Sequence, residues 1–472
     1  MAACAALVHA DDLAARVTHT GTERPRGPDH MIGTRPRSSH ESNAREVIVT
    51  PGNLGTRGGP AGAFLRRQQR DWGVTVVRTS LDRLAYQMVF PYLSVYIVAL
   101  GATATQLGLV SSLGMAVAGL AGPFVGWLID RHGPRTFYLV GIGFLAVAYL
   151  TYALANSWPV SILAMMAYWL GYSISGHSCA TICGNCLANR DRATAMMICE
   201  TVGAGMLGII GPMLGAFVVL SSGGIDPRAI RPLFVLAAGI SVLTFVIVFK
   251  QLSPQRWGSG RSLGNRSAVL RDLREVMQGS YLKRWLVIAA VGQLPVGMVL
   301  AFSQVYAHEV KGADALVLGA MAAGSAVVSI VLAVPLGRLA DRIGRKRVLF
   351  LTIPLFMLSN LVLIWAPGPV FLVAAGALQS FFYLGGPISA AMERELVPAA
   401  HMGRWIGIAR VVRMLLSAAL VLVAGFIWDS LGPEYVFLAF VAIDLAVRVP
   451  LLATMPDTLG MSFAAAPVPV AD

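Results

Sequence analysis

A short basic stretch occurs twice in this chain of 472 residues, each time between two long apolar runs. Gly126 and Gly337 are 211 residues apart, and Asp130 and Asp341 are separated by the same 211 residues, so the two copies are in register. The repeat predicts a duplicated membrane protein. The complete copy reads Gly337-Arg338-Leu339-Ala340-Asp341-Arg342-Ile343-Gly344-Arg345-Lys346-Arg347, and the imperfect copy reads Gly126-Trp127-Leu128-Ile129-Asp130-Arg131-His132-Gly133-Pro134-Arg135.

The residue types in these stretches suit a tight loop at a membrane surface. Glycine adopts positive φ at no steric cost, so Gly133 and Gly344 permit a sharp reversal of the chain. The basic residues hold such a loop on the cytoplasmic side of the bilayer. An aspartate at the end of one helix can also face the positive N-terminal end of another helix. A plain basic loop would need neither the aspartate nor the glycines.

The amino-acid composition also favours a membrane protein, because 56% of the residues are hydrophobic, 13% are charged and the mean hydropathy is +0.67. A soluble domain carries about 25% charged residues. The formal net charge of +13 does not indicate nucleic acid, since the basic residues lie between apolar runs and form no stripe with interleaved aromatic side chains. The five cysteines give no secreted disulfide framework.

Twelve apolar segments between Thr79 and Leu452 are long enough to cross a bilayer, which takes about 20 residues of helix. The loops on one side hold most of the Lys and Arg residues, including Arg131, Arg135 and the eight basic residues from Lys250 to Arg284. The loops on the other side are nearly free of them. The positive-inside rule therefore predicts that both termini are cytoplasmic.

These features predict an all-α membrane protein with twelve transmembrane helices in two six-helix, pseudo-symmetric bundles. Residues 1–72 should form a disordered cytoplasmic extension, because they are rich in Arg, Gly, Pro and Ser and lack helical periodicity. We expect the first bundle at 73–250, a cytoplasmic linker at 251–284, the second bundle at 285–453 and a cytoplasmic tail at 454–472. A duplicated bundle with a site between its halves is the architecture of alternating access.

The repeated loop resembles the signature of the major facilitator superfamily, a Gly-x-Leu-x-Asp-Arg-x-Gly-Arg-Arg/Lys turn between helices 2 and 3 of each half. The second copy matches at every signature position, and the first departs at Pro134, where the pattern has a basic residue. The resemblance implies a substrate site between the two bundles and a gating role for the loops. The residues given this role are Gly126, Asp130, Arg131, Gly133, Arg135, Gly337, Asp341, Arg342, Gly344 and Arg345.

A charged side chain inside a span costs about 2.5 to 3.5 kcal/mol on insertion scales, so each one needs a reason. The resemblance implies that helices 1, 4, 7 and 10 line a cavity, and polar residues occur in each of them. The candidates for this cavity are Arg83, Gln87, Gln293, Gln304, Gln379 and Tyr383. A simpler explanation for Asp82 and Arg83 is that they reach the membrane surface as a pair.

Three titratable side chains are candidates for proton coupling: Asp82, His177 and Glu200. A histidine titrates near neutral pH, and burial can bring the pKa of a carboxyl group into the same range. The family's exporters carry an arginine in helix 4 shortly before a glycine, and this chain lacks it, so coupling has to use other groups. For His177, a structural hydrogen bond to a neighbouring helix is the competing explanation.

Glycines in the fifth apolar segment predict a kinked helix that packs closely. Gly211, Pro212 and Gly215 resemble part of the family's antiporter signature, with Ala216 at its last glycine. A Gly-Pro kink lets two helices approach and bend at a gate. This feature favours export over uptake.

Charged residues near the end of the chain have two predicted roles. Arg410 and Arg413 are expected to form a cytoplasmic gate by pairing with acidic side chains of the first half. Asp444 and Arg448 are spaced i, i+4 and should neutralise each other.

Cys179, Cys183 and Cys186 are spaced so that they share one helix face, with His177 a turn away. A soft metal ion accepts such ligands. Small residues, cysteine included, are also ordinary packing material between membrane helices. We therefore expect no metal site and no cofactor.

The expected function is secondary active transport of a small molecule across the cell membrane by alternating access, with drug or metabolite efflux by proton antiport as the first choice. Ion-coupled uptake of sugars or organic ions is the alternative within this class. A non-transporting membrane sensor or scaffold is the alternative from another class. The sequence has no ATP-binding signature, so an ion gradient has to supply the energy. An enzyme is not expected, and the expected partners of the monomeric chain are a small-molecule substrate, protons and the lipid bilayer, without nucleic acid.

Overall fold

The computed structural model describes residues 70–186, 192–253, 280–397 and 402–458. Side chains at 130, 180, 184, 185, 192–206, 280–282, 402–404 and 408 lie outside that description, although their backbone is helical. The described residues belong to one compact unit, Arg70–Asp472, and every regular element in them is a helix. The predicted N-terminal extension and linker fall largely outside the described residues.

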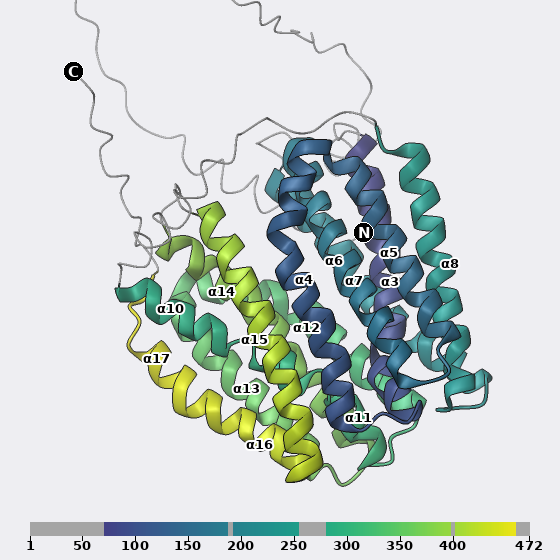
Figure 1. The fold of residues 1–472 in the computed structure, drawn as a ribbon. Coiled ribbons are helices and arrows are strands. Elements are labelled where there is room, and N and C mark those ends of the chain that lie inside the picture. Colours follow the sequence, from purple (N-terminus) through teal and green to yellow (C-terminus); the bar gives the residue numbers. More distant parts are fainter. Residues whose placement is uncertain (1–69, 187–191, 254–279, 398–401, 459–472) are drawn as a thin grey trace, which may run out of the picture. The chain divides into compact units, whose positions relative to one another are not determined.

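The first half of the chain forms six helices, drawn in purple to teal in Figure 1. We call them the N-half: α3 (Arg70–Ala99), α4 (Ala104–His132), α5 (Pro134–Leu154), α6 (Trp158–Cys186), α7 (Arg192–Ser221) and α8 (Pro227–Gln251). The second half forms α10 (Ser280–Val291), η1 (Pro295–Val299), α11 (Ser303–Glu309), α12 (Ala315–Ile343), α13 (Arg345–Trp365), α14 (Pro369–Leu396), α15 (Met402–Ser430), α16 (Pro433–Ile443), η2 (Asp444–Arg448) and α17 (Val449–Ala453). We call these the C-half.

The helix bounds reproduce the sequence repeat. α4 and α12 begin at 104 and 315 and end at 132 and 343, an offset of 211 residues at both ends. α5 and α13 begin at 134 and 345 and end at 154 and 365, with the same offset. The prediction of two related bundles of six spans is confirmed, with α10–η1–α11 and α16–η2–α17 each counted as one interrupted span.

Two predicted spans are interrupted rather than continuous. The sequence predicts one helix from Trp285 to His308, but the structure has α10, a π-helical segment η1 and α11 over this range. Pro295, the first residue of η1, has no N–H to donate and its ring crowds the preceding turn. The last span contains a second π-helical segment, η2, followed by a short helix with Pro450 near its start.

Nine segments in the described residues are long and apolar enough to cross a membrane. Helices α3, α6 and α7 are the remaining spans, and only Leu207–Ser221 of α7 stands out there as a shorter apolar stretch. α3 packs against α6, α7, α8, α11 and α12, so neighbouring helices cover its polar side chains. Shielding by neighbours is what an ionisable residue in a span requires.

The helices run between two sets of loops. The basic end contains the turns at 132–134 and 343–345 and the end of α8 at Gln251, and its N-half part is at the top of Figure 1. The bare end contains the turns at 100–103, 155–157, 222–226, 310–314, 366–368 and 431–432, and it is at the bottom. The two halves meet mainly where α4 packs on α15 and where α7 packs on α12.

Close helix packing in the N-half depends on glycine. Lipid gives no hydrophobic drive between helices, so association relies on close van der Waals contact. A Cβ added to Gly211 of α7 would lie 2.8 Å from Gln87 Cβ, and one added to Gly171 would lie 2.7 Å from Gly141 O. The predicted close packing of the fifth span is confirmed, and α7 continues as a helix through Pro212.

Candidate functional site

The halves are tied together at the bare end by a carboxylate placed on a helix N-terminus. Asp429, near the end of α15, accepts a hydrogen bond of 2.8 Å from the backbone N–H of Thr105, in the first turn of α4. A Cβ on Gly425 would lie 2.8 Å from Thr105 Cα, so the two backbones are in direct contact. Negative charge at the N-terminus of a helix is favourable.

A second tie at the bare end joins α3 and α7 to α12. The Tyr92 hydroxyl donates a hydrogen bond of 2.9 Å to Ala315 O, in the first turn of α12. A Cβ on Gly319 would lie 2.9 Å from Pro212 O and 3.0 Å from the Tyr92 hydroxyl. The bare end is therefore closed on both sides of the interface between the halves.

Contact between α4 and α15 ends near the middle of α4. A Cβ on Gly119 would still lie 3.0 Å from Met414 Cβ. Closer to the basic end, Cβ atoms on Gly122, Gly126 and Gly407 would meet nothing within 4 Å among the described residues. The described glycines of this helix pair therefore show tight contact over the bare half, and those closer to the basic end make no such contact.

Arg83 of α3 lies in a group of tyrosines from α3 and α6. It is within electrostatic range of Tyr86, Tyr168 and Tyr172. The Tyr168 ring stacks on Tyr86 with 6.2 Å between ring centroids and on Tyr172 with 6.4 Å. Helix α6, which lacks the arginine expected in helix 4, therefore places the hydroxyls of Tyr168 and Tyr172 near Arg83 of α3.

Polar groups of the C-half reach the same region. Tyr383 of α14 is within electrostatic range of Arg83, and Arg410 of α15 is within range of Tyr172 and His177. Arg83, Tyr172 and Tyr383 each lie near the middle of their helix. We call Arg83, Tyr172, His177, Tyr383 and Arg410 the central polar set. It joins α3 and α6 to α14 and α15 at mid-height, where an alternating-access protein binds its cargo.

Asp82 has an ion-pair partner that the sequence did not suggest. Its carboxylate lies 3.5 Å from Arg78 Nη2, one turn away on α3, and its side chain is 19% exposed. Arg78 is itself buried, and its guanidinium lies 5.0 Å from the centre of the Tyr138 ring. Asp82 and Arg78 thus form an ion pair within α3 that neighbouring helices largely cover.

The other two coupling candidates are placed differently. His177 Nε2 is buried and has no hydrogen-bond partner within the described ranges, so the competing structural hydrogen bond finds no support there. The Glu200 side chain lies outside the described residues. The coupling roles stay predictions.

The glutamines predicted for the cavity lie in three different places. Gln304 and Gln379 are buried, and Gln304 Oε1 and Gln379 Nε2 have no hydrogen-bond partner in the described part of the chain. Gln293 lines a cavity inside the C-half, together with Tyr383. Gln87 instead packs against Gly211, where α3 meets α7. Their role in binding stays a prediction.

The second copy of the repeated loop is held by charged contacts within the C-half. Arg345, the first residue of α13, lies 2.8 Å from Glu395 Oε1 through Nη1 and 3.6 Å from Asp341 Oδ1 through Nη2. Gly344 has φ of 105° and Gly133, its counterpart in the first copy, has φ of 91°, so the prediction of positive φ at both glycines is confirmed. The turn thereby joins α12 and α13 to the end of α14.

The same turn also binds the chain that follows α17, which the sequence did not indicate. Lys346 Nζ donates hydrogen bonds of 2.8 Å to Ala453 O and 2.6 Å to Met455 O. A Cβ on Gly344 would lie 2.7 Å from Asp457 Oδ1, so this carboxylate sits over the N-terminus of α13. No local pattern marks a contact between residues more than one hundred positions apart.

The first copy makes a different contact. Arg135 Nη2 donates a hydrogen bond of 2.9 Å to Phe249 O, in the last turn of α8. Pro134 occupies the first position of α5, where a helix needs no N–H. The Asp130 side chain lies outside the described residues, so its charge contact stays a prediction.

Replacing Arg345 by Gln should loosen the second turn. The substitution removes the charge that Glu395 and Asp341 share, and partly buried pairs of this kind contribute on the order of 1 kcal/mol. We expect the melting temperature of the purified protein to fall by about 1–2 °C. Arg342→Gln is the matched control, because Arg342 is exposed in the same turn and makes no hydrogen bond or ion pair with the described residues. Equal melting temperatures for the two variants would contradict this account.

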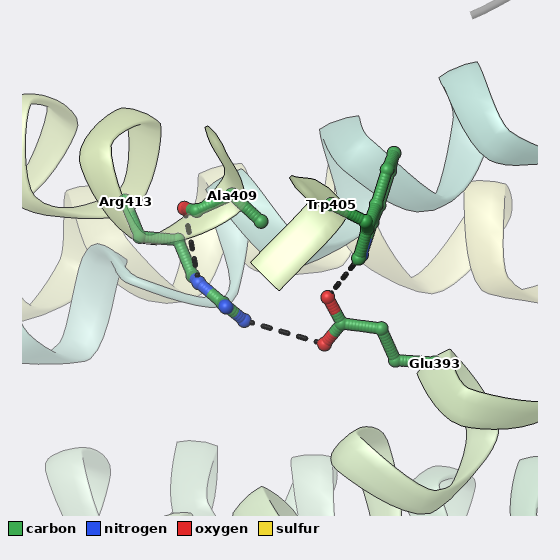
Figure 2. A network of polar contacts seen from close by, with 4 residues as sticks. All are labelled: Glu393, Trp405, Ala409 and Arg413. Carbon is green, nitrogen blue, oxygen red and sulfur yellow. Dashed lines mark hydrogen bonds and ion pairs between the residues drawn. The ribbon is translucent and has the colours of Figure 1, made fainter. Parts of the chain in front are cut away.

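Arg413, predicted as part of a gate between the halves, has its partner within the C-half, as Figure 2 shows. Its guanidinium lies 3.5 Å from Glu393 Oε2, and its Nε donates to Ala409 O at 3.2 Å. The other Glu393 oxygen accepts a hydrogen bond from the Trp405 indole. Among the described residues no ion pair joins the halves at the basic end, and the Glu200 side chain lies outside them, so the predicted gate contact stays a prediction. The pair Asp444–Arg448 is confirmed, at 3.6 Å.

A duplicated, twelve-span helical fold with a polar set between its halves defines a membrane transporter of small molecules rather than an enzyme. The sequence profile of the Major Facilitator Superfamily matches residues 79–332 and 297–458. The chain belongs to this family.

Relatives and solved structures agree with this assignment. The chain is 27% identical over 291 residues to the multidrug resistance protein MdtG of Dickeya zeae, an alignment that covers 59% of this chain and 67% of that protein. A mutant of the nucleoside transporter NupG has a TM-score of 0.69 at 16% identity and covers 81% of this chain and 99% of its own. A D-xylose–proton symporter has a TM-score of 0.64 at 14% identity, with 82% and 98% covered. These structural likenesses concern the fold alone.

Proposed function

We propose that this chain exports small amphipathic molecules, drugs or metabolites, in exchange for protons. The observation that carries the proposal is the closed bare end, where Asp429, Gly425 and Tyr92 tie the halves together. The described glycines near the basic end of α4 meet nothing across the interface. In this state the central polar set is shut off from the bare end, as an exporter requires while it loads cargo.

We assign the basic end to the cytoplasm, since basic loops are retained there. Both termini are then cytoplasmic. The bundles at 73–250 and 285–453, joined by the linker at 251–284, would rock about the central polar set and expose it to one side at a time. The chain needs no second copy for this cycle, so we propose that it acts as a monomer in the cell membrane.

Two observations favour export over uptake. The relative from Dickeya zeae is named a multidrug resistance protein. Gly211, Pro212 and Gly215, which resemble the antiporter signature in sequence, lie where α7 packs closely on α3. Asp82 and His177 are the coupling groups proposed within the described side chains, and Glu200 is the third. Protons that bind on the outer side and leave on the inner side would drive the return step.

The sign of coupling tests this proposal in sealed proteoliposomes with an imposed pH gradient. Labelled quaternary ammonium ions, sugars and organic acids would be added outside vesicles with an acidic interior. Quaternary ammonium ions are chosen as the cations because their fixed charge prevents the trapping that weak bases undergo in acidic vesicles. Antiport predicts that the exported class accumulates inside as protons leave, and protein-free vesicles give the baseline. Accumulation in alkaline vesicles instead would mean symport, and no protein-dependent accumulation in either case would contradict the proposal.

A further inference from the structure

A cavity of about 250 Å³ is lined entirely by residues of the C-half. Its walls come from α10, α13, α14 and α15, with Arg448 of η2 and Leu452 of α17 at one side. Every lining residue lies between Trp285 and Leu452. The cavity shares Tyr383 with the central polar set and none of the other four residues of that set.

The polar groups in this wall have an excess of hydrogen-bond donors. Trp285 is 1% exposed, and its indole N–H has no acceptor within the described ranges. Arg448 Nε is likewise buried without an acceptor there, while its Nη1 lies 3.6 Å from Asp444. A buried donor without a partner costs free energy that a bound acceptor would recover.

The one carboxylate that lines the cavity is already engaged. Both oxygens of Glu393 are taken, one by the Trp405 indole and the other by Arg413 at 3.5 Å (Figure 2). Glu393 therefore has little capacity to bind a cation. Within the lining, the unfilled demand comes from Trp285 and Arg448, both of which are donors. The oxygens of Asp444, which also have no hydrogen-bond partner in the described residues, belong to the ion pair with Arg448 and lie outside the lining.

The remaining wall is aromatic and apolar. Phe356 and Phe382 lie with 5.7 Å between ring centroids, and Phe381 stands beside them in the lining. Ligand pockets commonly measure about 300–1,000 Å³, so this cavity suits a molecule of one or two rings. Flat rings pack well against such walls.

We propose that this C-half cavity binds a small aromatic organic anion, whose ring lies on the phenylalanine wall and whose carboxylate accepts hydrogen bonds from Trp285 and Arg448. Tyr383 is 45% exposed and is in electrostatic range of Arg83 in the N-half, so it stands where the cavity meets the central polar set. That the bound anion is cargo rests on the proposed function. The binding site itself does not.

Equilibrium binding of naphthoate to the purified full-length chain in detergent tests this site. Wild type should bind naphthoate saturably and should not bind naphthylmethylammonium. Trp285→Phe keeps the ring and removes only the donor, and the loss of a hydrogen bond to a charged acceptor should weaken naphthoate binding about tenfold to hundredfold. Trp428→Phe is the matched control, because Trp428 packs on Phe302 and Tyr306 outside the cavity.

A second variant fills the cavity from its wall. A Cβ on Gly385 would lie 3.5 Å from Thr352 Oγ1 and 3.9 Å from Leu349 Cδ2, both in the lining, so the larger side chain of Gly385→Leu enters the cavity and should abolish naphthoate binding. Unchanged binding in both Trp285→Phe and Gly385→Leu, or a preference for the ammonium compound, would overturn the proposal. Failure of antiport in proteoliposomes, with these binding results intact, would count against the proposed function and leave this site standing.

Discussion

Asp82→Asn should abolish substrate-driven proton movement while substrate binding stays close to that of wild type. The variant keeps the size and one hydrogen-bond acceptor of the carboxylate but cannot exchange a proton, and it leaves Arg78 facing a neutral group at 3.5 Å. A coupling carboxylate carries the proton step, so we expect the proton flux to fall by about tenfold or more. The measurement is the pH change inside sealed proteoliposomes after substrate is added.

Asp82→Glu is the matched control, because it retains a titratable carboxylate on the same face of α3, and it should keep most of the flux. A melting curve for each variant separates lost coupling from lost structure, since Arg78 is buried and depends on its surroundings. Normal proton flux in Asp82→Asn would remove Asp82 from the coupling group. The same assay on His177→Asn and Glu200→Gln would then test the two remaining candidates.

Gly425→Leu should prevent the bare end from closing and so stop transport. The added side chain would have to occupy the space of the α4 backbone, because even a Cβ would lie 2.8 Å from Thr105 Cα. Overpacking costs about 1–3 kcal/mol or more, and a coupling free energy of that size changes a two-state ratio by about 5- to 150-fold. The closed-bare-end state should therefore become the minor state, and the transport rate should fall accordingly.

Gly239→Leu is the control for this variant, since Gly239 is exposed on α8, which packs on α3, α5 and α7 of the N-half, and a Cβ there meets nothing within 4 Å. Its transport should stay near that of wild type. A thiol reagent applied from the bare-end side to a cysteine at Thr105 should react faster in the Gly425→Leu background than in the Gly239→Leu background. Equal transport by the two glycine variants would contradict the assignment of the bare end as a moving contact.

The repeat was the part of the fold that the sequence predicted best. The 211-residue offset foretold that α4 with α5 and α12 with α13 would have matching bounds, and Gly133 and Gly344 have the positive φ expected of them. Both results depend on local chain chemistry, namely apolar length and the freedom of glycine. Information of this kind lies within a few residues of the position that it determines.

The interrupted spans were not predictable in the same way. Pro91, Pro212 and Pro335 lie inside continuous helices, whereas Pro295 begins a π-helical break. Neighbouring helices decide whether the backbone groups freed by a proline are satisfied. The sequence alone does not state which neighbours those are.

The sequence also did not predict which ion-pair and hydrogen-bond partners meet across the fold. Arg78 precedes the first predicted span, which starts at Thr79, whereas α3 begins at Arg70 and places Arg78 one helical turn from Asp82. Lys346 binds Met455 O, a partner 109 residues away. Charge pairs one turn apart, such as Asp444 and Arg448, could be predicted because the helix itself sets their distance.

The central claim is that the two halves close one end while they open the other, and distances between spin labels at both ends test it most directly. Cysteines at Gly101 and Leu431 would report across the bare end, and cysteines at His132 and Arg342 across the basic end, in a background with the five native cysteines replaced. Proton-driven return of an antiporter predicts that acidification shortens the distance from Gly101 to Leu431 while the distance from His132 to Arg342 lengthens. Two distances that stay fixed, or that both lengthen or both shorten, would contradict it.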